Sequence, residues 1–305
     1  MSGSELTRRA LLRRSGVAVA AGVASAGCST LSGSGGDTDV YTRWLPAPSA
    51  RNVSHYWFDY YDLSALAAQR ESLGGEPTVF ERTWAPVGLD WDDATAVVAV
   101  DGVDVVTAEF DRDGAAADLR EADYERAGEY KGYVRYRDAD TGRVFAVTDG
   151  TLLVSSAERY APASVAPSER LETVVDAVTG DIERYAEVDE DMRALVEELG
   201  TATIVSGTTR GGPDAATTGS GRFENLVARG TSSAVDGDTV EETWVYLYDR
   251  PEDVDLAALE AYVEANDDPA DGADAPFATV EDISYAREGR TGIVTGTRDA
   301  EAYYA

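Results

Sequence analysis

The stretch TAVVAVDGVDVVTAEFDR, residues 95–112, carries the clearest fold signal in this 305-residue chain. A largely apolar, alternating run lies on each side of Asp101-Gly102, and a period of two is typical of a half-buried β-strand. Asp-Gly supplies the positive φ angles that a type I′ turn requires. The stretch therefore predicts a β-hairpin that ends at Asp111-Arg112.

A second stretch repeats this order further along the chain. An apolar run at 226–235 meets Asp236-Gly237 and continues at 239–248. A short helical segment follows each hairpin, at 115–122 in the first half and at 255–266 in the second. Two more strands joined by a tight turn come next in each half. They lie at 144–147 and 151–155 in the first half and at 283–286 and 291–295 in the second.

Both halves thus follow the order strand–strand–helix–strand–strand, which is what duplication of one unit would produce. We predict an α+β fold with two similar antiparallel sheet-plus-helix halves, the first at 40–185 and the second at 186–305. The hairpins argue against two α/β lobes with parallel sheets, which require longer crossover connections.

Three further helices are expected between these elements. Asp62 is a candidate cap for a helix over 63–73. Ser168 is a candidate cap for a second helix that ends at Gly180, and a third helix ends before Gly200. The second and third helices carry apolar stripes, so we expect them to join the halves and pack on a sheet.

The charge of the chain is strongly and uniformly negative. Asp and Glu number 57 against 26 Lys and Arg, which gives a net charge of -31, and Lys131 is the only lysine. Such self-repulsion is screened in molar salt, where the Debye length is about 3 Å. The composition resembles that of haloarchaeal proteins, and in low salt we expect partial unfolding. A surface for cations or a basic partner is the alternative explanation.

The same composition excludes several classes of function. A nucleic-acid partner is excluded because phosphate neutralisation needs a basic face. Cys28 is the only cysteine and His55 the only histidine, so a disulfide framework, a cysteine metal cage and a multi-histidine zinc site are excluded.

The N-terminus is typical of an export signal. Arg8 and Arg9, followed by Ala10 and two leucines, precede a weakly apolar stretch at 16–27 that is shorter than a membrane span. The paired arginines resemble the twin-arginine signal, which implies export of a folded protein through the twin-arginine machinery.

Cys28 lies where small residues define a cleavage site. The segment Ser25-Ala26-Gly27-Cys28 resembles a lipobox, in which the cysteine becomes the lipid-modified first residue, although Ser25 replaces the usual large aliphatic residue. Simple cleavage beside an incidental cysteine is the alternative. We predict a signal peptide at 1–27, a lipidated Cys28 with a Gly/Ser tether at 28–39, and anchoring at the extracellular face of the cell membrane.

The densest aromatic run of the chain is His55-Tyr-Trp-Phe-Asp-Tyr-Tyr61. Alternation in a strand places Tyr56, Phe58 and Tyr60 on one face. The other face would carry His55, Trp57, Asp59 and Tyr61. One interpretation is an aromatic platform for a sugar or another flat ligand, and the other is a strand buried on both faces. Just before this run, Asn52 begins a glycosylation sequon, Asn-Val-Ser.

No catalytic, metal or cofactor motif is present in the sequence. His55 could act as a general base, but no serine lies in a Gly-x-Ser-x-Gly nucleophile elbow. The carboxylates are so numerous that their spacing cannot identify a catalytic pair. Asp138-x-Asp140-x-Gly142 and the acidic stretch 267–274 are incomplete calcium loops, which we interpret as solvated turns.

Residues 1–28 resemble those of twin-arginine-exported haloarchaeal lipoproteins. This resemblance implies a membrane-anchored extracellular lipoprotein, to which we assign a binding or structural role without catalysis. Two alternatives remain open: a substrate-binding lipoprotein of an importer, and a surface hydrolase that uses two carboxylates. The hydrolase predicts a cleft with two acids, one of which has a raised pKa.

Overall fold

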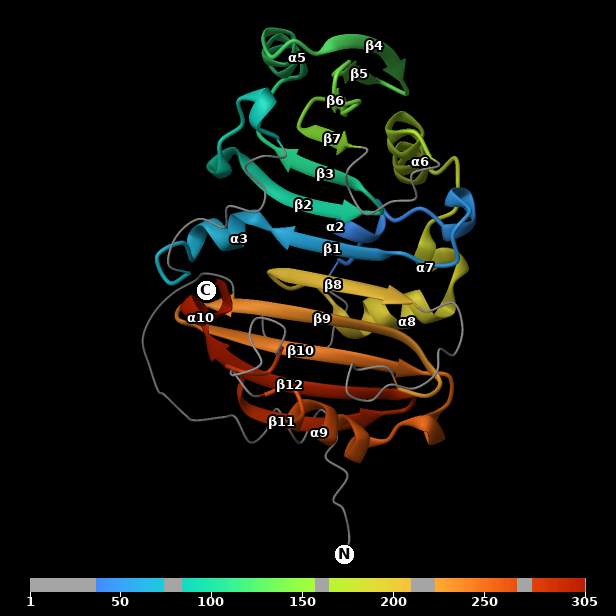
Figure 1. Ribbon diagram of the computed structural model, residues 1–305, viewed down its shortest axis with the longest axis vertical. Helices are drawn as coiled ribbons and strands as arrows, with labels where there is room; N and C mark the ends of the chain where they lie inside the picture. The colour runs from blue at the N-terminus through green and yellow to red at the C-terminus, as the bar shows by residue number, and fades with distance from the viewer. Residues whose placement is uncertain (1–36, 74–83, 157–164, 210–222, 268–275, 305) are drawn as a thin grey trace, which may run out of the picture.

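Twelve strands form one antiparallel sheet in the computed structural model, which describes residues 37–73, 84–156, 165–209, 223–267 and 276–304. The strand order is β11-β12-β10-β9-β8-β1-β2-β3-β7-β6-β5-β4, and every pairing between these strands is antiparallel (Figure 1). Together with the helices described below, this sheet confirms the predicted α+β class.

The strands fall on either side of the central pair β1 and β8. On one side the sheet contains β1 (Trp57–Asp62), β2 (Ala94–Val100), β3 (Val103–Ala108), β4 (Glu125–Tyr130), β5 (Tyr133–Arg137), β6 (Val144–Thr148) and β7 (Thr151–Ser155). On the other side it contains β8 (Ile204–Thr209), β9 (Leu226–Asp236), β10 (Thr239–Tyr248), β11 (Glu281–Glu288) and β12 (Thr291–Asp299).

The helices are short and lie between the strands in the chain. The α-helices are α2 (Asp39–Thr42), α3 (Leu63–Ala68), α5 (Arg112–Glu121), α6 (Pro167–Thr179), α7 (Tyr185–Val188), α8 (Glu190–Leu199), α9 (Leu256–Glu264) and α10 (Ala300–Tyr304). The 3-10 helices are η1 (Pro48–Arg51), η2 (Ala85–Val87), η3 (Trp91–Asp93) and η5 (Pro251–Asp253). Among the described residues no helix is long and apolar enough to cross a membrane.

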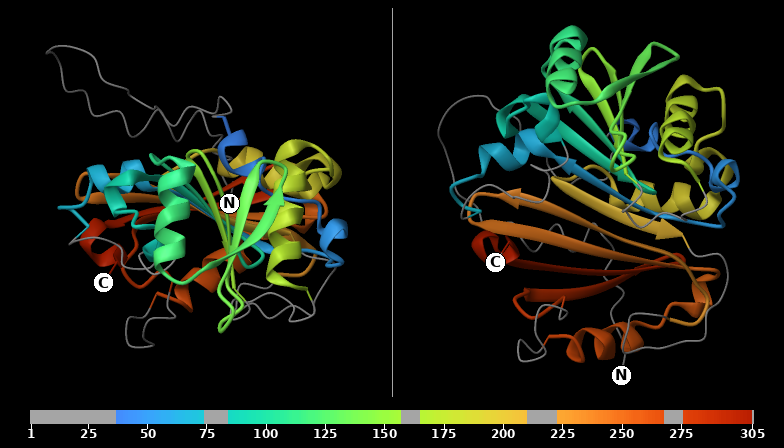
Figure 2. Two further views of the ribbon diagram at one scale, coloured as in Figure 1. Left: turned by 90° about the horizontal axis from the view of Figure 1, so that it is seen from above. Right: turned by 45° about the horizontal axis from the view of Figure 1, so that its top comes forward.

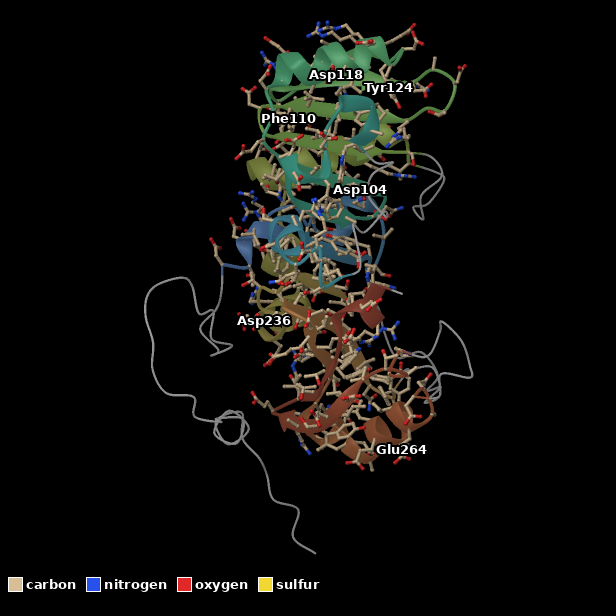
Figure 3. All side chains as sticks on the ribbon, turned by 90° about the vertical axis from the view of Figure 1, so that its left-hand side faces the viewer. Asp104, Phe110, Asp118, Tyr124, Asp236 and Glu264 are labelled. Atoms are coloured by element: carbon tan, nitrogen blue, oxygen red, sulfur yellow. The ribbon has the colours of Figure 1, made fainter. Side chains whose placement is uncertain are left out.

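Helices cover both faces of the sheet, as the two views of Figure 2 show. We call the face that packs against α2, α6, α7 and α8 the α8 face, and its core includes Phe58, Val105 and Leu153. We call the opposite face the α9 face. There α3, α5 and α10 pack over one half of the sheet and its centre, and α9 packs over the other half. Tyr124, just before β4, and Glu264 of α9 lie toward opposite ends of the long axis (Figure 3).

The two predicted long hairpins are present but their turns differ. In the first, Val100 pairs with Val103, and both loop residues, Asp101 and Gly102, have positive φ angles of 42° and 79°, as a type I′ turn requires. In the second, Asp236 pairs with Thr239, so the loop is Gly237-Asp238. Only Gly237 has a positive φ, 60°, which is the pattern of a type II′ turn.

Two other expectations need correction. Ser168 does not cap its helix, because α6 begins at Pro167 and Ala166 precedes it, while Gly180 ends the helix in a left-handed conformation as predicted. The strands β4 and β5 were not predicted, and they lie between α5 and β6. The β4 side chains are almost all exposed, so β4 lacks the alternation by which a strand is recognised.

Helix α8 packs closely on the centre of the sheet. A Cβ atom at Gly230 of β9 would lie 2.5 Å from the carbonyl oxygen of Ser206 and 2.7 Å from Cδ1 of Leu199. Glycine is therefore required at this position because a side chain would clash with the backbone of β8 and would also displace Leu199 of α8.

Candidate functional site

The aromatic run forms β1 at the centre of the sheet. Phe58 and Tyr60 point to the α8 face, where both rings contact Tyr41 with centroid separations of 5.6 and 5.3 Å. Tyr56, just before the strand, is also buried and donates a 2.6 Å hydrogen bond to the carbonyl oxygen of Pro46. The predicted placement of Tyr56, Phe58 and Tyr60 on one face is thus confirmed.

The opposite face of β1 is partly open. Trp57 is 42% exposed, so the interpretation that β1 is buried on both faces is wrong at this residue. Its indole Nε1 donates a 2.9 Å hydrogen bond to Oδ1 of Asp59, and the hydroxyl of Ser206 on β8 donates to the same oxygen at 2.5 Å. Among the described contacts, Oδ2 of Asp59 accepts no hydrogen bond.

An arginine from the next strand but one completes this arrangement. Arg229 of β9 pairs with Thr208 of β8, which in turn pairs with Trp57, so all three side chains share the α9 face. The guanidinium carbon of Arg229 lies 5.6 Å from the centroid of the Trp57 ring, within the range of a cation–π contact. Within the described part of the chain, Arg229 makes no hydrogen bond or ion pair.

We call Trp57, Asp59, Ser206 and Arg229 the Trp57 platform. Two tyrosines on the same face lie near Arg229, and its positive charge affects their pKa values. Burial raises the pKa of Tyr246 and of Tyr262, and the positive charge of Arg229 opposes both shifts. The guanidinium thus contacts the exposed indole and lies near buried Tyr246 and half-buried Tyr262, and its donors make no hydrogen bond within the described residues.

The structure places the other predicted ligand residues at the ends of β1. His55 is exposed, with Nδ1 2.9 Å from the hydroxyl of Ser54, and no described contact joins it to Trp57 or Asp59. Tyr61 is half-buried and packs against the core near α3. Asn52, the glycosylation candidate, is exposed in a left-handed conformation at the end of η1.

Sequence reasoning missed Ser206 and Arg229. Both belong to strands whose pairing with β1 depends on tertiary register, which local sequence does not specify. The alternation of 226–235 was recognised and would have placed Arg229 on a definite strand face. It could not have placed that face beside Trp57.

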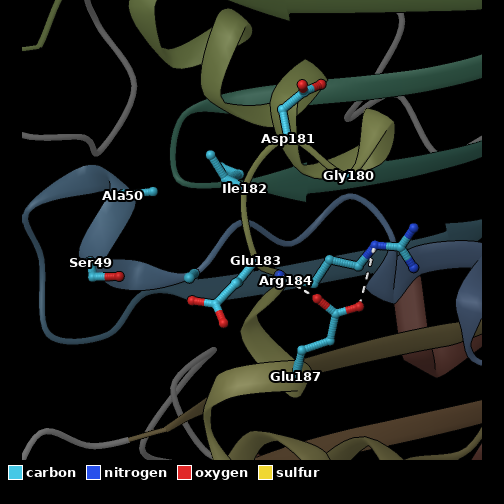
Figure 4. Close-up of a pocket in the computed structure, with 9 residues that line it drawn as sticks. Ser49, Ala50, Gly180, Asp181, Ile182, Glu183, Arg184 and Glu187 are labelled. Atoms are coloured by element: carbon cyan, nitrogen blue, oxygen red, sulfur yellow. Dashed lines mark hydrogen bonds and ion pairs between the residues drawn. The ribbon is translucent and has the colours of Figure 1, made fainter.

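A separate cavity lies beside η1 and the connection between α6 and α7. It has a volume of about 600 Å³, and its charged residues include Asp181, Arg184 and Glu187 (Figure 4). Arg184 is already bound, at 2.9 Å from Asp39 and 4.0 Å from Glu187. This cavity therefore offers a ligand no free cation from Arg184.

The carboxyl groups with raised pKa values do not form a catalytic pair. Burial raises the pKa of Asp101 and of Glu242, and in each case a neighbouring arginine, Arg51 or Arg298, opposes the shift. Asp101 lies in the β2–β3 turn and Glu242 on β10, with β1, β8 and β9 between them in the sheet. The described residues also contain no group of three or more His, Cys, Asp and Glu side chains placed to hold a metal ion.

Several predicted features are turns or lie outside the described residues. Asp138 accepts hydrogen bonds from the backbone of Asp140 and Thr141, which is a self-contained turn before β6. Arg8, Arg9, Cys28 and most of the acidic stretch 267–274 are outside the described residues.

Comparison with known proteins finds a likeness of fold. No family model matches the chain, and no curated protein matches it. The solved structure of crystal form III of TP0453 is 11% identical, over 87% of this chain and 96% of that one, with a TM-score of 0.51. Crystal form IV of TP0453 is 12% identical, over 81% and 90% of the two chains, with a TM-score of 0.48. At this identity, the chain is similar to TP0453 in fold alone.

Proposed function

We propose that this chain is an extracellular binding protein, exported through Arg8 and Arg9, anchored to the cell membrane through Cys28 and without catalytic activity. The observation that carries the binding role is the Trp57 platform. An exposed indole, a carboxylate with one oxygen that accepts no hydrogen bond and an arginine that forms no ion pair, both judged within the described residues, share one face of the central strands. In so acidic a chain, an arginine that has no carboxylate partner among the described residues is a feature that folding alone does not require.

The groups of the platform indicate the chemistry of the ligand. The Trp57 ring offers a flat apolar surface on which a sugar or another flat ring can stack. Oδ2 of Asp59 can accept a hydrogen bond from a hydroxyl group, and Arg229 can donate to an acidic or carbonyl oxygen. A sugar ring that carries a carboxylate, as a uronic acid does, would use all three groups.

Tryptophan fluorescence tests this proposal directly. The other described tryptophans, Trp44, Trp84, Trp91 and Trp244, are at most 6% exposed, so a bound ligand should change mainly the emission of Trp57. We expect a saturable change on titration with uronic acids in molar potassium chloride, and a smaller one with neutral sugars. Arg229→Gln should remove the preference for the acid, and Trp57→Ala should remove binding.

The control for these variants is Val188→Ala, which changes another exposed apolar side chain, 45% exposed on α7. Its affinity should equal that of the wild type. A wild-type protein that binds no sugar and no planar acid would contradict the proposed site, as would a Trp57→Ala variant with unchanged affinity.

The anchor has a separate test. Expressed in a halophilic host, the wild type should be recovered with membranes, and Cys28→Ala should release it to the medium. Replacing Arg8 and Arg9 with lysines should retain the precursor in the cell. If Cys28→Ala remains membrane-bound, lipidation is not the anchor.

We also infer that the two halves of the sheet arose by duplication. Outward from the centre the strands run β1-β2-β3-β7-β6 on one side and β8-β9-β10-β12-β11 on the other. In both, a helix on the α9 face, α5 or α9, separates the two hairpins. The strands β4 and β5 would then be an insertion in the first half. We prefer the role proposed above to the two alternatives, because an importer's binding protein would have two parallel-sheet lobes and a hydrolase would need its two acids close together, whereas Asp101 and Glu242 lie far apart in one antiparallel sheet.

A further inference from the structure

A groove lies on the α8 face of the second half, away from the Trp57 platform. It has a volume of about 350 Å³ and is bounded by Leu199 and Ala202 at the end of α8. Its floor is formed by β9, β10, β12 and β11, and most of its side chains are small or carry hydroxyl groups. The floor includes Ala234, Thr243, Val245, Ala286, Ile293 and Thr295.

The equivalent surface of the first half is covered by a helix. There α6 packs on β3, β7 and β6, and its buried residues include Leu171, Val174 and Val175. In the second half, the helix that follows β12 turns to the other face, because Tyr303 of α10 bonds the hydroxyl of Ser233 and packs near Val240. No helix among the described residues therefore occupies the position on the second half that α6 occupies on the first.

The covered surface holds its helix partly by charge. Lys131, between β4 and β5, forms ion pairs with Asp176 of α6 and with Asp181 just beyond it, and Arg135 of β5 pairs with Glu172. The sheet thus supplies the cations and the helix supplies the carboxylates.

The groove has the opposite charge. Glu241 of β10 and Asp282 and Glu288 of β11 are among its lining residues. Within the described part of the chain, none of the three forms an ion pair. A molecule that complements these three carboxylates would carry positive charges beside its apolar surface.

We propose that this groove docks an amphipathic helix of a partner protein, with an apolar stripe flanked by arginine or lysine. The groove reaches from β9 to β11, which are three strand spacings apart, or about 14 Å. A helix about 10 Å wide fits across that floor. The 13 residues of α6 show how long a helix the same sheet accommodates on its other half. This inference does not depend on the ligand of the Trp57 platform.

Fluorescence anisotropy with two labelled helical peptides tests this inference on the full exported chain. Both peptides have 13 residues and the same leucine stripe, and they differ in having arginine or glutamate beside it. We expect the arginine peptide to bind at least tenfold more tightly. The difference should shrink as potassium chloride rises through the range in which circular dichroism shows a folded protein, because the Debye length falls from about 10 Å at 0.1 M to about 3 Å at 1 M.

Two sets of variants locate the binding. Thr295→Arg and, separately, Ala286→Arg place a long side chain on the floor and should each weaken the arginine peptide at least tenfold. Val40→Arg on α2, where the native side chain is 39% exposed, is the control and should leave binding unchanged. Replacing Glu241 and Asp282 with arginine together should reverse the preference between the peptides.

Three outcomes would overturn the inference. The first is equal affinity for both peptides, or no binding of either, by a wild-type protein that is folded by circular dichroism. The second is unchanged affinity in both floor variants. The third is a wild-type dimer in sedimentation velocity that Thr295→Arg dissociates, because a second copy would then cover the groove.

Discussion

The α8 face of the sheet is closed over one half and open over the other. Under α6 the floor is built from Val103, Val105 and Leu153, all at most 1% exposed. In the groove the equivalent strands present Thr243, Ile293 and Thr295, which remain half-exposed. Two surfaces with the same strand order thus differ in side-chain size and polarity.

This contrast shows that strand order and covering are decided separately. The order of strands follows from the hairpins and from the helix between them. Whether a further helix covers the face depends on the apolar area that the strands offer, since burial contributes roughly 25 cal/mol per Å². The large aliphatic floor is stable only when α6 covers it. The hydroxyl-rich floor is stable while it is exposed to water and can bind a partner later.

The largest effects are expected at two buried ion pairs among the described residues, one taken from each half. Arg51 pairs with Asp101 at 2.7 Å, with side chains 2% and 10% exposed, and Arg298 pairs with Glu242, with side chains 14% and 7% exposed. Removing one partner of a buried pair costs about 3–5 kcal/mol. We expect Arg51→Met to lower the free energy of unfolding more than Arg298→Met, in denaturant titrations at pH 7 and molar potassium chloride.

The pH dependence of these variants has a definite sign. Burial already raises the pKa of Glu242 and Arg298 holds it down, so Arg298→Met should raise that pKa further. A carboxyl with a raised folded-state pKa lowers stability as pH rises from the unfolded value, about 4.3 for glutamate, through the folded value. The deficit of Arg298→Met should therefore be largest near pH 7 and shrink toward pH 4. A deficit that is constant with pH would show that packing, and not charge, is lost.

A second pair of variants compares the covered and open surfaces directly. Leu171→Ala removes a side chain that is 1% exposed between α6 and the sheet, and it should cost about 2–5 kcal/mol. Ile293→Ala in the groove removes a half-exposed side chain and should cost less than about 1 kcal/mol. Both losses are measured by urea titration, in which the slope of the free energy of unfolding against urea concentration should not change. Equal losses would mean that the groove floor is covered in solution.

The sequence allowed the local turns and helix caps to be predicted, but not which strands pair with each other in the sheet. Hairpin turns such as Asp101-Gly102 and helix caps such as Asp62 act within a few residues, and the structure has both as predicted. Pairing of β1 with β8 joins residues about 150 positions apart, and no local rule provides that register.

The same limit applies to the Trp57 platform. The alternation of β1 was enough to place Trp57 and Asp59 on one face, as the structure has them. Ser206 and Arg229 join them only through strand pairing. His55 was assigned to the same face by extending the alternation beyond the strand, which begins at Trp57.

The smallest effect is expected at the exposed rim of the covered surface, where Lys131 binds Asp176 and Asp181. The hydrogen bond from Lys131, followed by that from Thr179, lowers the pKa of Asp181, and bonds to Asp176 and Asp181 raise the pKa of Lys131. A carboxyl with a lowered pKa adds stability above its unfolded value, about 3.9, and loses it as pH falls through the folded value. The lysine adds stability below its unfolded value, about 10.4, and loses it as pH rises through the folded value.

Lys131→Met should therefore loosen α6 slightly between about pH 4 and pH 10, and the effect should fade as pH falls below that range. Hydrogen exchange should quicken at the C-terminal turn of α6 and stay unchanged in α8. Arg126→Gln, which removes an exposed pair with Glu129 on the edge strand β4, is the matched control and should leave both helices unaffected. If Lys131→Met leaves α6 exchange unchanged at pH 7 at every salt concentration at which the protein is folded, the charges at this rim do not hold the helix. The arginine or lysine residues proposed beside the apolar stripe of the partner helix would then lose the support that the covered surface gives them.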